Sequence, residues 1–372
     1  MSQLDRYILV MAGGRGERFW PVSREKTPKQ LIRLLGDRSF LQQTVDRVLE
    51  LVPIDNILII TNQAQTNEVK KQLPNLPVEN IIAEPCGRDT CAAISLGAAL
   101  VASRNSKATM AVLPADHLIQ DRKKFQRVLK DCYHLASRQP ALVTIGIRPT
   151  EPATGYGYIM TDSMLKPELG KVKIQTPFWK VRQFVEKPNL TKAKRFLKSG
   201  NYRWNAGMFV WSVETFLHAL ETHRPKMAEA CRNWTRLANR PTLLKRALKK
   251  EYPDIERISI DFALMEKAGN VVMAEGAFDW DDLGSWTALE RHLASDGNRN
   301  YFRGDLMQLD SHGNIIFDAR KKKGRPIALI GILDCIVVQT DDACLIAAKS
   351  HSQQIKQLVQ MLAKDQRFRK LT

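Results

Sequence analysis

Short apolar runs alternate with amphipathic segments along the N-terminal part of the chain. The runs are typical of buried strands, and the segments between them carry apolar residues at helical spacing. Ser39 and Gln42 form a capping box at the start of the first such segment. The predicted strands are Tyr7–Val10, Ile57–Thr61, Met110–Leu113 and Ala141–Ile147, and the other predicted helices are Thr90–Arg104 and Phe125–Ala136. This alternation predicts an α/β fold with helices on both faces of a mostly parallel sheet.

The pattern becomes mixed after Pro149 and changes again near Asn300. The middle section predicts strands at Val181–Glu186 and Met208–Val213, and helices at Thr191–Lys198 and Ile260–Ala268. The last section predicts short strands followed by an amphipathic helix: Leu306–Leu309, Ile315–Phe317, Ile327–Ile330, Cys335–Gln339, Ala343–Ala347, and a helix through Ile355, Leu358, Val359 and Leu362. We therefore expect a large domain of residues 1–296 and a small domain of residues 297–372.

Three glycines follow the first predicted strand. Gly13, Gly14 and Gly16 let the backbone turn tightly and bring its N–H groups close to a ligand. Six basic residues and two acids (Glu17 and Glu25) in this region give a local charge of +4; the basic residues are Arg15, Arg18, Arg24, Lys26, Lys29 and Arg33. Such a loop suits a triphosphate, and an ordinary turn with solvated arginines is the alternative. Proline before Lys29 favours the phosphate site, because it fixes the backbone there.

Two better-known glycine loops are excluded by the residues that follow these glycines. The nucleoside-triphosphatase loop requires Gly-Lys-Ser/Thr, which is absent from this stretch. The dinucleotide fingerprint requires a third glycine, where this chain has Phe19.

Size and composition describe an ordinary globular protein. The chain has 372 residues, of which 44% are hydrophobic and 26% charged, enough for one large and one small domain. Its apolar runs fall well short of the ~20 residues that span a bilayer, so we expect no membrane association. We also expect no cleaved signal, since a basic segment followed by a long apolar one is missing at the start. Six scattered cysteines without a C-x-x-C pair predict reduced thiols and a cytoplasmic protein.

The net charge of +18 is concentrated in part in two basic clusters, Lys245–Lys250 and Arg320–Arg325. They are either solvated faces or a surface that binds nucleic acid through counterion release. Neither cluster contains interleaved aromatic residues that could stack on bases. We therefore favour solvated faces and expect no nucleic-acid partner.

Seven motifs occur in order along nearly the whole chain. They are GGRGERFWPVSREKTPKQ (Gly13–Gln30), EPCGRDT (Glu84–Thr90), LPADH (Leu113–His117), TGYGYI (Thr154–Ile159), FVEKP (Phe184–Pro188), WNAGMF (Trp204–Phe209) and WDDLGSW (Trp280–Trp286). In this order they resemble the sugar-1-phosphate nucleotidyltransferases, and within them the mannose-1-phosphate guanylyltransferases, or GDP-mannose pyrophosphorylases. The resemblance implies a Rossmann-like nucleotidyltransferase fold in residues 1–296. It also implies that residues 297–372 form a β-helix-like domain closed by the terminal helix.

The resemblance further implies an enzyme that transfers GMP from GTP to mannose 1-phosphate, giving GDP-mannose and pyrophosphate by Mg²⁺-dependent in-line displacement. Such chemistry needs charge neutralisation and alignment more than an acid or a base. The three glycines would wrap the triphosphate, Arg18 would contact its β- and γ-phosphates, and Lys29 would neutralise charge in the transition state. An exposed lysine without a role is the alternative for Lys29. Glu84 and Pro85 would lie near the base or the ribose.

Asp116 and Asp282 are the expected metal ligands. Mg²⁺ takes one or two carboxylates and completes its octahedron with phosphate oxygens and water. Asp116 follows a predicted strand, so it would lie at the carboxyl edge of the sheet, with a helix cap as the alternative. Asp282 is preferred to Asp281 because it matches the family's aspartate two residues before the glycine. His117 would support neighbouring site residues without touching the substrate, since this chemistry needs no histidine base.

The sugar phosphate is expected at Gly157, Glu186, Lys187 and Asn205. The Glu186 carboxylate would accept hydrogen bonds from sugar hydroxyls, and Lys187 would pair with the phosphate. Adjacent strand residues face opposite ways, so both reach one ligand only if the strand bends before Pro188; a surface salt bridge is the alternative. By the resemblance, Asn205 contacts the sugar, and Gly157 allows its close approach. Three aromatic residues of these motifs are expected to pack: Tyr156, Tyr158 and Trp204.

Two residues depart from the family pattern, and other functions stay open. Asp89 replaces the usual asparagine and Cys91 the usual alanine; Asp89 either bonds guanine or caps the next helix, and we favour the cap. The alternatives are another pair of sugar 1-phosphate and nucleotide, a non-catalytic nucleotide-sugar-binding regulator, or a nucleic-acid-binding protein. The complete set of charged motif residues argues against a regulator. A β-rich C-terminal domain favours a homodimer, and 372 residues leave no room for a second, isomerase domain, so we expect one activity.

Overall fold

The computed structural model describes residues 5–14, 16–167, 172–322 and 324–372. The chain divides into two compact units. The first consists of Met1–Gly13 and Thr44–Asp281, and the second of Gly14–Gln43 and Asp282–Thr372. The second unit thus combines the glycine segment with the C-terminal part of the sequence. The predicted domain boundary between residues 296 and 297 stays a prediction. Arg15 and Lys323, which belong to the predicted basic segments, lie outside the described residues.

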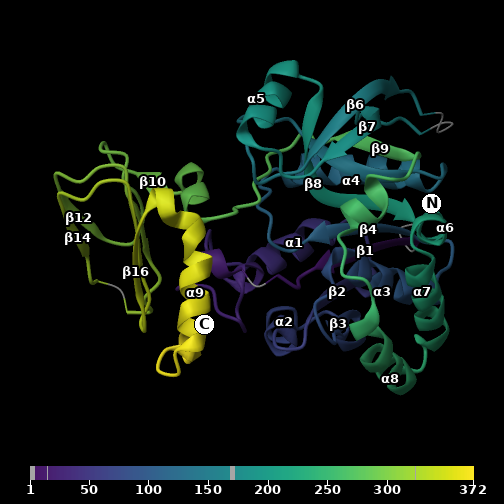
Figure 1. Cartoon of the computed structure of the whole chain (residues 1–372), viewed down its shortest axis with the longest axis horizontal. Helices are drawn as coiled ribbons and strands as arrows, with labels where there is room; N and C mark the ends of the chain where they lie inside the picture. Colours follow the sequence, from purple (N-terminus) through teal and green to yellow (C-terminus); the bar gives the residue numbers. More distant parts are fainter. Residues whose placement is uncertain (1–4, 15, 168–171, 323) are drawn as a thin grey trace. The chain divides into compact units, whose positions relative to one another are not determined.

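A nine-stranded mixed sheet forms the centre of the first unit, in the order β3-β2-β1-β4-β8-β5-β9-β7-β6 (Figure 1). Its strands are β1 (Arg6–Met11), β2 (Ile57–Asn62), β3 (Ile81–Glu84), β4 (Thr109–Pro114), β5 (Leu142–Ile147), β6 (Tyr158–Leu165), β7 (Phe178–Val185), β8 (Tyr202–Ser212) and β9 (Val271–Glu275). The strands from β1 to β4 pair in parallel, whereas β8 lies antiparallel between β4 and β5. The predicted Rossmann-like α/β fold is confirmed, and its antiparallel strands come from the mixed middle section.

Helices flank this sheet (Figure 1). They are α2 (Thr66–Gln72), α3 (Asp89–Arg104), α4 (Arg122–Ala136), α5 (Leu190–Ser199), α6 (Val213–His223), α7 (Pro225–Leu237) and α8 (Pro241–Glu251). Small residues let α3 pack closely against β1, since a Cβ added at Gly97 would overlap the Leu9 side chain. The predicted helices α3, α4 and α5 are confirmed to within a few residues.

Helix α1 (Phe40–Val48) begins at the predicted capping box. The Ser39 N–H donates to Gln42 Oε1 at 3.1 Å, and the Gln42 N–H donates to Ser39 Oγ at 3.2 Å. This reciprocal pair satisfies two N–H groups that a helix start leaves without partners. The capping box is therefore confirmed.

Two predicted elements differ from the structure. The predicted helix Ile260–Ala268 is only a π-helical turn, Asp261–Met265. The predicted strand Met208–Val213 begins earlier, and it ends at Ser212. The Ser212 hydroxyl accepts from the Thr215 N–H at 3.1 Å and so starts α6 one residue later.

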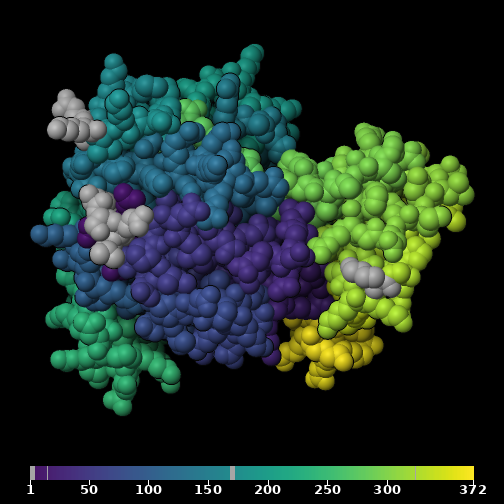
Figure 2. All heavy atoms as spheres, turned by 180° about the vertical axis from the view of Figure 1, so that it is seen from behind, coloured from purple at the N-terminus to yellow at the C-terminus, as the bar shows by residue number. Residues whose placement is uncertain are grey.

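The second unit contains short strands stacked as in a β-helix. They are β10 (Ala294–Ser295), β11 (Tyr301–Arg303), β12 (Leu306–Leu309), β13 (Ile315–Asp318), β14 (Ile327–Ile330), β15 (Cys335–Gln339) and β16 (Cys344–Ala348). The series β11–β13–β15 and the pair β12–β14 are parallel, and only β10 with β11 and β16 with β15 pair antiparallel among the described residues of this unit. The buried side chains Ile316, Leu329 and Val337 fill the space within the coil. Helix α9 (Ile355–Lys364) follows and buries Ile355 and Val359; Figure 2 shows the C-terminal residues in yellow. The predicted β-helix-like domain with a terminal helix is confirmed.

Two further expectations concern membranes and thiols. None of the helices in the described part of the chain combines the length and the apolar character that crossing a bilayer requires. All six cysteines are free thiols, and Cys91, Cys132 and Cys231 are buried.

Candidate active site

The glycine segment folds onto the lysine that follows it. Gly16 has a left-handed φ of 60°, and a Cβ at this position would overlap the Lys29 backbone. Only glycine fits both demands, the left-handed backbone and the close approach. The Gln30 side-chain amide donates to the Gly14 carbonyl oxygen at 2.9 Å and closes the turn from the other side. Gly16 therefore lies directly against Lys29, and Gly14 lies against Gln30.

The two predicted cations of the phosphate site bond to the same backbone segment. The Lys29 ammonium donates to the Asp282 carbonyl oxygen, and Arg18 Nη1 donates to the Gly284 carbonyl oxygen at 3.1 Å. Lys29 is only 5% exposed, and its ammonium lies 5.9 Å from the Phe19 ring centroid. The alternative of an exposed lysine is thus wrong, and Arg18 remains exposed beside the turn. Their roles toward phosphate stay predictions.

Trp286, the last residue of the WDDLGSW motif, packs against this segment. Its ring centroid lies 5.2 Å from that of Phe19 and 5.1 Å from that of Phe317 in β13. Its indole N–H donates to the Trp20 carbonyl oxygen at 3.1 Å. These tilted ring contacts and the indole bond therefore fix the segment after the glycines on the β-helix-like strands of the same unit.

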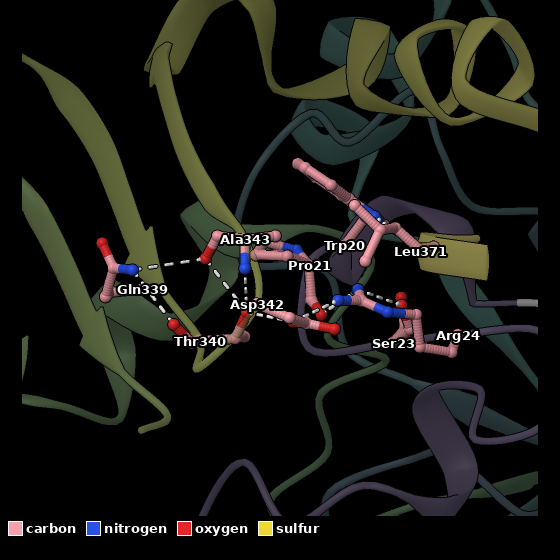
Figure 3. A network of polar contacts seen from close by, with 9 residues as sticks. All are labelled: Trp20, Pro21, Ser23, Arg24, Gln339, Thr340, Asp342, Ala343 and Leu371. Carbon is pink, nitrogen blue, oxygen red and sulfur yellow. Dashed lines mark hydrogen bonds and ion pairs between the residues drawn. The ribbon is translucent and has the colours of Figure 1, made fainter. Parts of the chain in front are cut away.

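Polar contacts anchor the segment at a second place (Figure 3). Arg24 Nη2 donates to Asp342 Oδ1 at 3.0 Å, beside the turn that follows β15. The Trp20 indole N–H donates to the Leu371 carbonyl oxygen at 2.8 Å. Burial lowers the pKa of Arg24, and the nearby Asp342 carboxylate opposes that effect. These contacts use sequence positions far apart, so local pattern could not reveal them.

Glu84 lies at the carboxyl end of β3 and faces the start of the glycine segment within the first unit. A Cβ at Gly13 would lie 3.3 Å from Glu84 Oε2, so the carboxyl group touches this turn. The Tyr252 hydroxyl donates to Glu84 Oε1 at 2.6 Å. Burial raises the pKa of Glu84 to about 7; the bond from Tyr252 opposes this rise and the Asp89 charge adds to it. Pro85 follows directly and is exposed.

Asp116 follows β4 at the same carboxyl edge of the parallel strands. The alternative that it caps a helix is wrong, because Asp121 caps α4 by accepting from the Lys124 N–H at 3.0 Å. The neighbouring His117 accepts the Trp280 indole N–H at Nδ1, 3.1 Å away. His117 therefore packs edge-on against the Trp280 ring, and its supporting role at the site stays a prediction.

The predicted metal ligands fall in different units, Asp116 in the first and Asp282 in the second. Asp282 is half-buried, whereas Asp281 is buried and pairs its backbone with Leu118. A half-buried carboxylate suits a Mg²⁺ ion completed by phosphate and water. Over the described residues, no group of three or more His, Cys, Asp or Glu side chains could hold a metal by itself. Asp116 and Asp282 as a metal pair thus stay a prediction.

The predicted sugar-phosphate residues converge in the first unit. Glu186 Oε2 lies 2.5 Å from the position of a Cβ at Gly157, and the Asn205 N–H donates to the Gly157 carbonyl oxygen at 2.8 Å. Lys187 has a φ of 44°, a left-handed bend that follows the end of β7. The bend lets Lys187 Nζ reach Glu186 Oε1 at 2.8 Å. The bend is present, and it joins the two side chains in the salt bridge that was the alternative to sugar binding. Their roles toward the sugar and its phosphate stay predictions.

Asp261 was missed by the sequence analysis, although it lies beside Asn205. Asn205 Nδ2 donates to Asp261 Oδ1 at 2.7 Å, while Asn205 Oδ1 accepts from the Thr144 hydroxyl at 3.2 Å. Burial raises the pKa of Asp261 to about 6, the Glu186 charge adds to this rise, and the bond from Asn205 opposes it. Asp261 lies in the predicted helix Ile260–Ala268, outside all seven motifs, so no sequence signal marked it as a site residue.

The aromatic motif residues pack as expected. The Tyr156 ring centroid lies 4.9 Å from that of Trp204 and 5.3 Å from that of Trp280, and Tyr158 is fully buried. Asp89 Oδ1 accepts only from the N–H of the next residue, Thr90, at 2.8 Å. The N-cap of α3 is Arg88, and no side chain of the described residues caps this helix start, so the favoured cap role of Asp89 is wrong. Cys91 is buried in the core below it.

The fold and this arrangement of residues define a nucleotide-binding α/β enzyme. The family model described as "Nucleotidyl transferase" matches residues 7–298. A second model, "MannoseP isomerase/GMP-like beta-helix domain", matches residues 304–362. The chain therefore belongs to the nucleotidyl transferase family, with a β-helix-like domain at its C-terminal end.

Three similar proteins have mannose 1-phosphate in their names. "Mannose-1-phosphate guanylyltransferase 2" of Escherichia coli O157:H7 is 36% identical over 371 residues, which are 99% of this chain and 75% of that protein. "Mannose-1-phosphate guanylyltransferase RfbM" of Salmonella typhimurium is 34% identical over 363 residues, covering 96% of this chain and 73% of that protein. A crystal structure described as mannose-1-phosphate geranyltransferase, from Thermus thermophilus, is 32% identical with a TM-score of 0.81, covering 96% of this chain and 99% of that one.

Proposed function

We propose that the chain transfers GMP from GTP to mannose 1-phosphate and releases pyrophosphate. The observation that carries this proposal is the joint contact of Lys29 and Arg18 with the Asp282–Gly284 backbone, beside a turn that requires glycine at position 16. Two cations and the backbone N–H groups of a glycine turn suit a triphosphate. The identity of the sugar and the base rests on the named relatives.

In the proposed reaction, a phosphate oxygen of mannose 1-phosphate attacks the α-phosphorus of GTP. A new P–O bond forms as the bond to the bridging oxygen of the β-phosphate breaks, and pyrophosphate leaves with that electron pair. Lys29 would neutralise charge that spreads over the reacting phosphates, and Arg18 would hold the departing β- and γ-phosphates. The N–H groups at Gly13, Gly14 and Gly16 would hold the phosphates in line for attack.

The two substrates differ in the groups they present to the first unit. Guanine offers N–H donors at N1 and at its 2-amino group, and the Glu84 carboxylate beside Gly13 can accept them, with Pro85 flanking the base. Mannose offers hydroxyl donors, which Glu186 and the Asn205–Asp261 pair can bind at Gly157. Lys187 would pair with the sugar phosphate.

A divalent metal ion is general in this family. We infer Mg²⁺, held by Asp116 and Asp282, because carboxylates with phosphate oxygens and water form its preferred set. When bound, Mg²⁺ would neutralise phosphate charge and hold the α-phosphate in position. We also infer a cytoplasmic protein, in keeping with its free thiols, and a homodimer joined through exposed strand edges.

The experiment that tests this function is pyrophosphate release with Mg²⁺, offering GTP, ATP, UTP and dTTP against mannose 1-phosphate and glucose 1-phosphate. We expect release with GTP and mannose 1-phosphate and much less with every other pair. Efficient release with another pair would keep the nucleotidyl transfer but refute the substrate assignment. Folded protein that binds nucleotide without any release would instead be a regulatory relative.

A further inference from the structure

One buried tyrosine holds the carboxyl group that faces the glycine turn. Tyr252 lies 168 residues from Glu84, yet its hydroxyl donates to Glu84 Oε1 at 2.6 Å. Both residues are buried, with Tyr252 0% and Glu84 8% exposed. The other oxygen, Oε2, is the atom that approaches Gly13. The two oxygens of Glu84 therefore have different surroundings, one against a fixed donor and one toward the turn.

We infer that Tyr252 is a positioning residue for nucleotide recognition, whose hydroxyl fixes the Glu84 carboxylate in the orientation that meets the base. This inference rests on the proposed function, in which Glu84 accepts hydrogen bonds from guanine. A carboxylate oxygen has room for more than one hydrogen bond, so the bond from Tyr252 leaves Glu84 able to accept from a ligand. It removes the freedom of the side chain to rotate away.

Tyr252 is itself held firmly. It follows the end of α8, and its ring stacks on Trp234 of α7 with centroids 5.6 Å apart and an interplanar angle of 29°. Trp234 in turn donates through Nε1 to Glu251 Oε2 at 3.0 Å. The position of the Tyr252 hydroxyl is thus set by the packing of α7 and α8, before any ligand binds.

The Tyr252 hydroxyl also influences whether Glu84 is protonated or ionised. A protonated carboxyl would present an O–H donor to the donor edge of guanine, whereas the ionised form presents acceptors only. The charged and titratable groups around this pair are Asp89, which faces Glu84, and Cys86 and Cys91, which face Tyr252. Asp89 favours the protonated form of Glu84, and the Tyr252 hydroxyl favours the ionised form. Without this hydroxyl, Glu84 would ionise at higher pH.

The test is the Tyr252→Phe variant, with GTP binding measured by calorimetry between pH 5.5 and pH 8.5. Loss of a hydrogen bond to a charged group predicts about a tenfold weaker Kd for GTP near pH 7. The pH midpoint of binding should shift upward, and the KM for mannose 1-phosphate should stay unchanged. Tyr133→Phe is the matched control, because it removes another buried hydroxyl, which donates to the Tyr7 carbonyl oxygen at 2.7 Å.

A double-mutant cycle tests whether Tyr252 acts through the Glu84 carboxylate. Glu84→Gln removes the charge that Tyr252 is inferred to hold, so adding Tyr252→Phe to it should weaken GTP binding no further. The inference would be overturned if Tyr252→Phe weakened GTP binding by the same factor in the wild type and in Glu84→Gln. It would also be overturned if Tyr252→Phe had the same Kd for GTP and the same pH midpoint of binding as the wild type. A ¹³C NMR titration of the Glu84 carboxyl in ligand-free protein adds a readout that no structural role would move.

These measurements separate the inference from the proposed function. Absence of pyrophosphate release in the wild type would refute the function, whereas GTP binding and the carboxyl titration need no turnover. If the wild type binds GTP without turnover and Tyr252→Phe weakens that binding, the inference stands alone. If the wild type binds no nucleotide, both are refuted.

Discussion

The Lys29 ammonium donates to the backbone carbonyl oxygen of Asp282, which lies 253 residues further along the chain. The contact joins the glycine segment and the WDDLGSW motif within one compact unit. Lys29 is buried, so its ammonium is already held in place without substrate. Charge that is fixed before the reaction needs little reorganisation during it, and this is the basis of electrostatic catalysis.

Removal of the Lys29 charge should therefore lower kcat more than it raises KM. We expect Lys29→Met to reduce kcat by about 10²–10³-fold, the range for loss of one preorganised donor. Steady-state pyrophosphate release measures it. Lys26→Met is the control, since Lys26 lies three residues earlier and is exposed. Equal kcat in the two variants would show that Lys29 has only a structural role.

Substitution of Gly16 should disrupt the site through the backbone. Gly16→Ala would force an L-residue into a left-handed φ and push its Cβ into the Lys29 backbone. Gly36→Ala carries the same kind of strain at φ 82° with no atom within 4 Å of the added Cβ. We expect ~1–2 kcal/mol of destabilisation in Gly36→Ala, as for any left-handed L-residue, and a larger loss together with a strong fall in kcat in Gly16→Ala. Urea unfolding and steady-state kinetics of both variants measure these effects. Similar stability and activity in the two variants would contradict the close approach of Gly16 to the Lys29 backbone.

Asp261 should make stability depend on pH. Its pKa in the folded protein is raised to about 6, so the folded state binds more protons than the unfolded state between about pH 4 and pH 6. The contribution of Asp261 to the free energy of unfolding therefore falls as the pH rises through that window, and it stays low at higher pH. Asp261→Asn keeps an acceptor for Asn205 but cannot ionise, so relative to wild type it should gain up to ~3 kcal/mol between pH 4 and pH 7.

Urea unfolding of wild type and Asp261→Asn at the two pH values measures this difference. The exposed Asp162 supplies the control, as Asp162→Asn should follow the wild-type profile. A stability gain in Asp261→Asn that is the same at both pH values would contradict the account. We also expect a higher KM for mannose 1-phosphate in Asp261→Asn, because the variant changes the partner of Asn205.

Lys187 should matter to the sugar phosphate and not to the nucleotide. Lys187→Met should raise the KM for mannose 1-phosphate by about tenfold, since one charge-assisted contact with phosphate is worth ~1.5–3 kcal/mol. The KM for GTP should not change. Lys194→Met, at an exposed position on α5, is the control. An equal rise in both KM values would place Lys187 in a general structural role instead.

Local pattern predicted much of the fold because its signals are short-range. The capping box of Ser39, the small residues of α3 and the apolar runs of β1, β2 and β4 each act within one element. The apolar spacing at Ile260–Ala268 did not distinguish a single π-helical turn from an α-helix, and it gave no sign that Asp261 bonds to Asn205 of β8. The order of the strands in the sheet was not predicted from the sequence either, because β8 pairs with β4 and β5 from a distant part of the chain.

The motifs named most site residues, but not the residues that hold them. Tyr252 and Asp261 lie outside the motifs, and each bonds a motif residue far away in sequence. The pH behaviour of Glu84 depends on its burial, which no local pattern reveals. Asp121, not Asp116, caps α4, and only the helix boundary in the structure decides between them.

The most direct test of the central claim is the stereochemistry of transfer from a single diastereomer of guanosine 5′-(α-thio)triphosphate to mannose 1-phosphate. A single in-line displacement predicts GDP-mannose that carries the sulfur on the phosphorus derived from GTP, with inverted configuration and release of pyrophosphate. Retention would reveal a covalent intermediate on the protein, and absence of guanylyl transfer to mannose 1-phosphate would contradict the function itself.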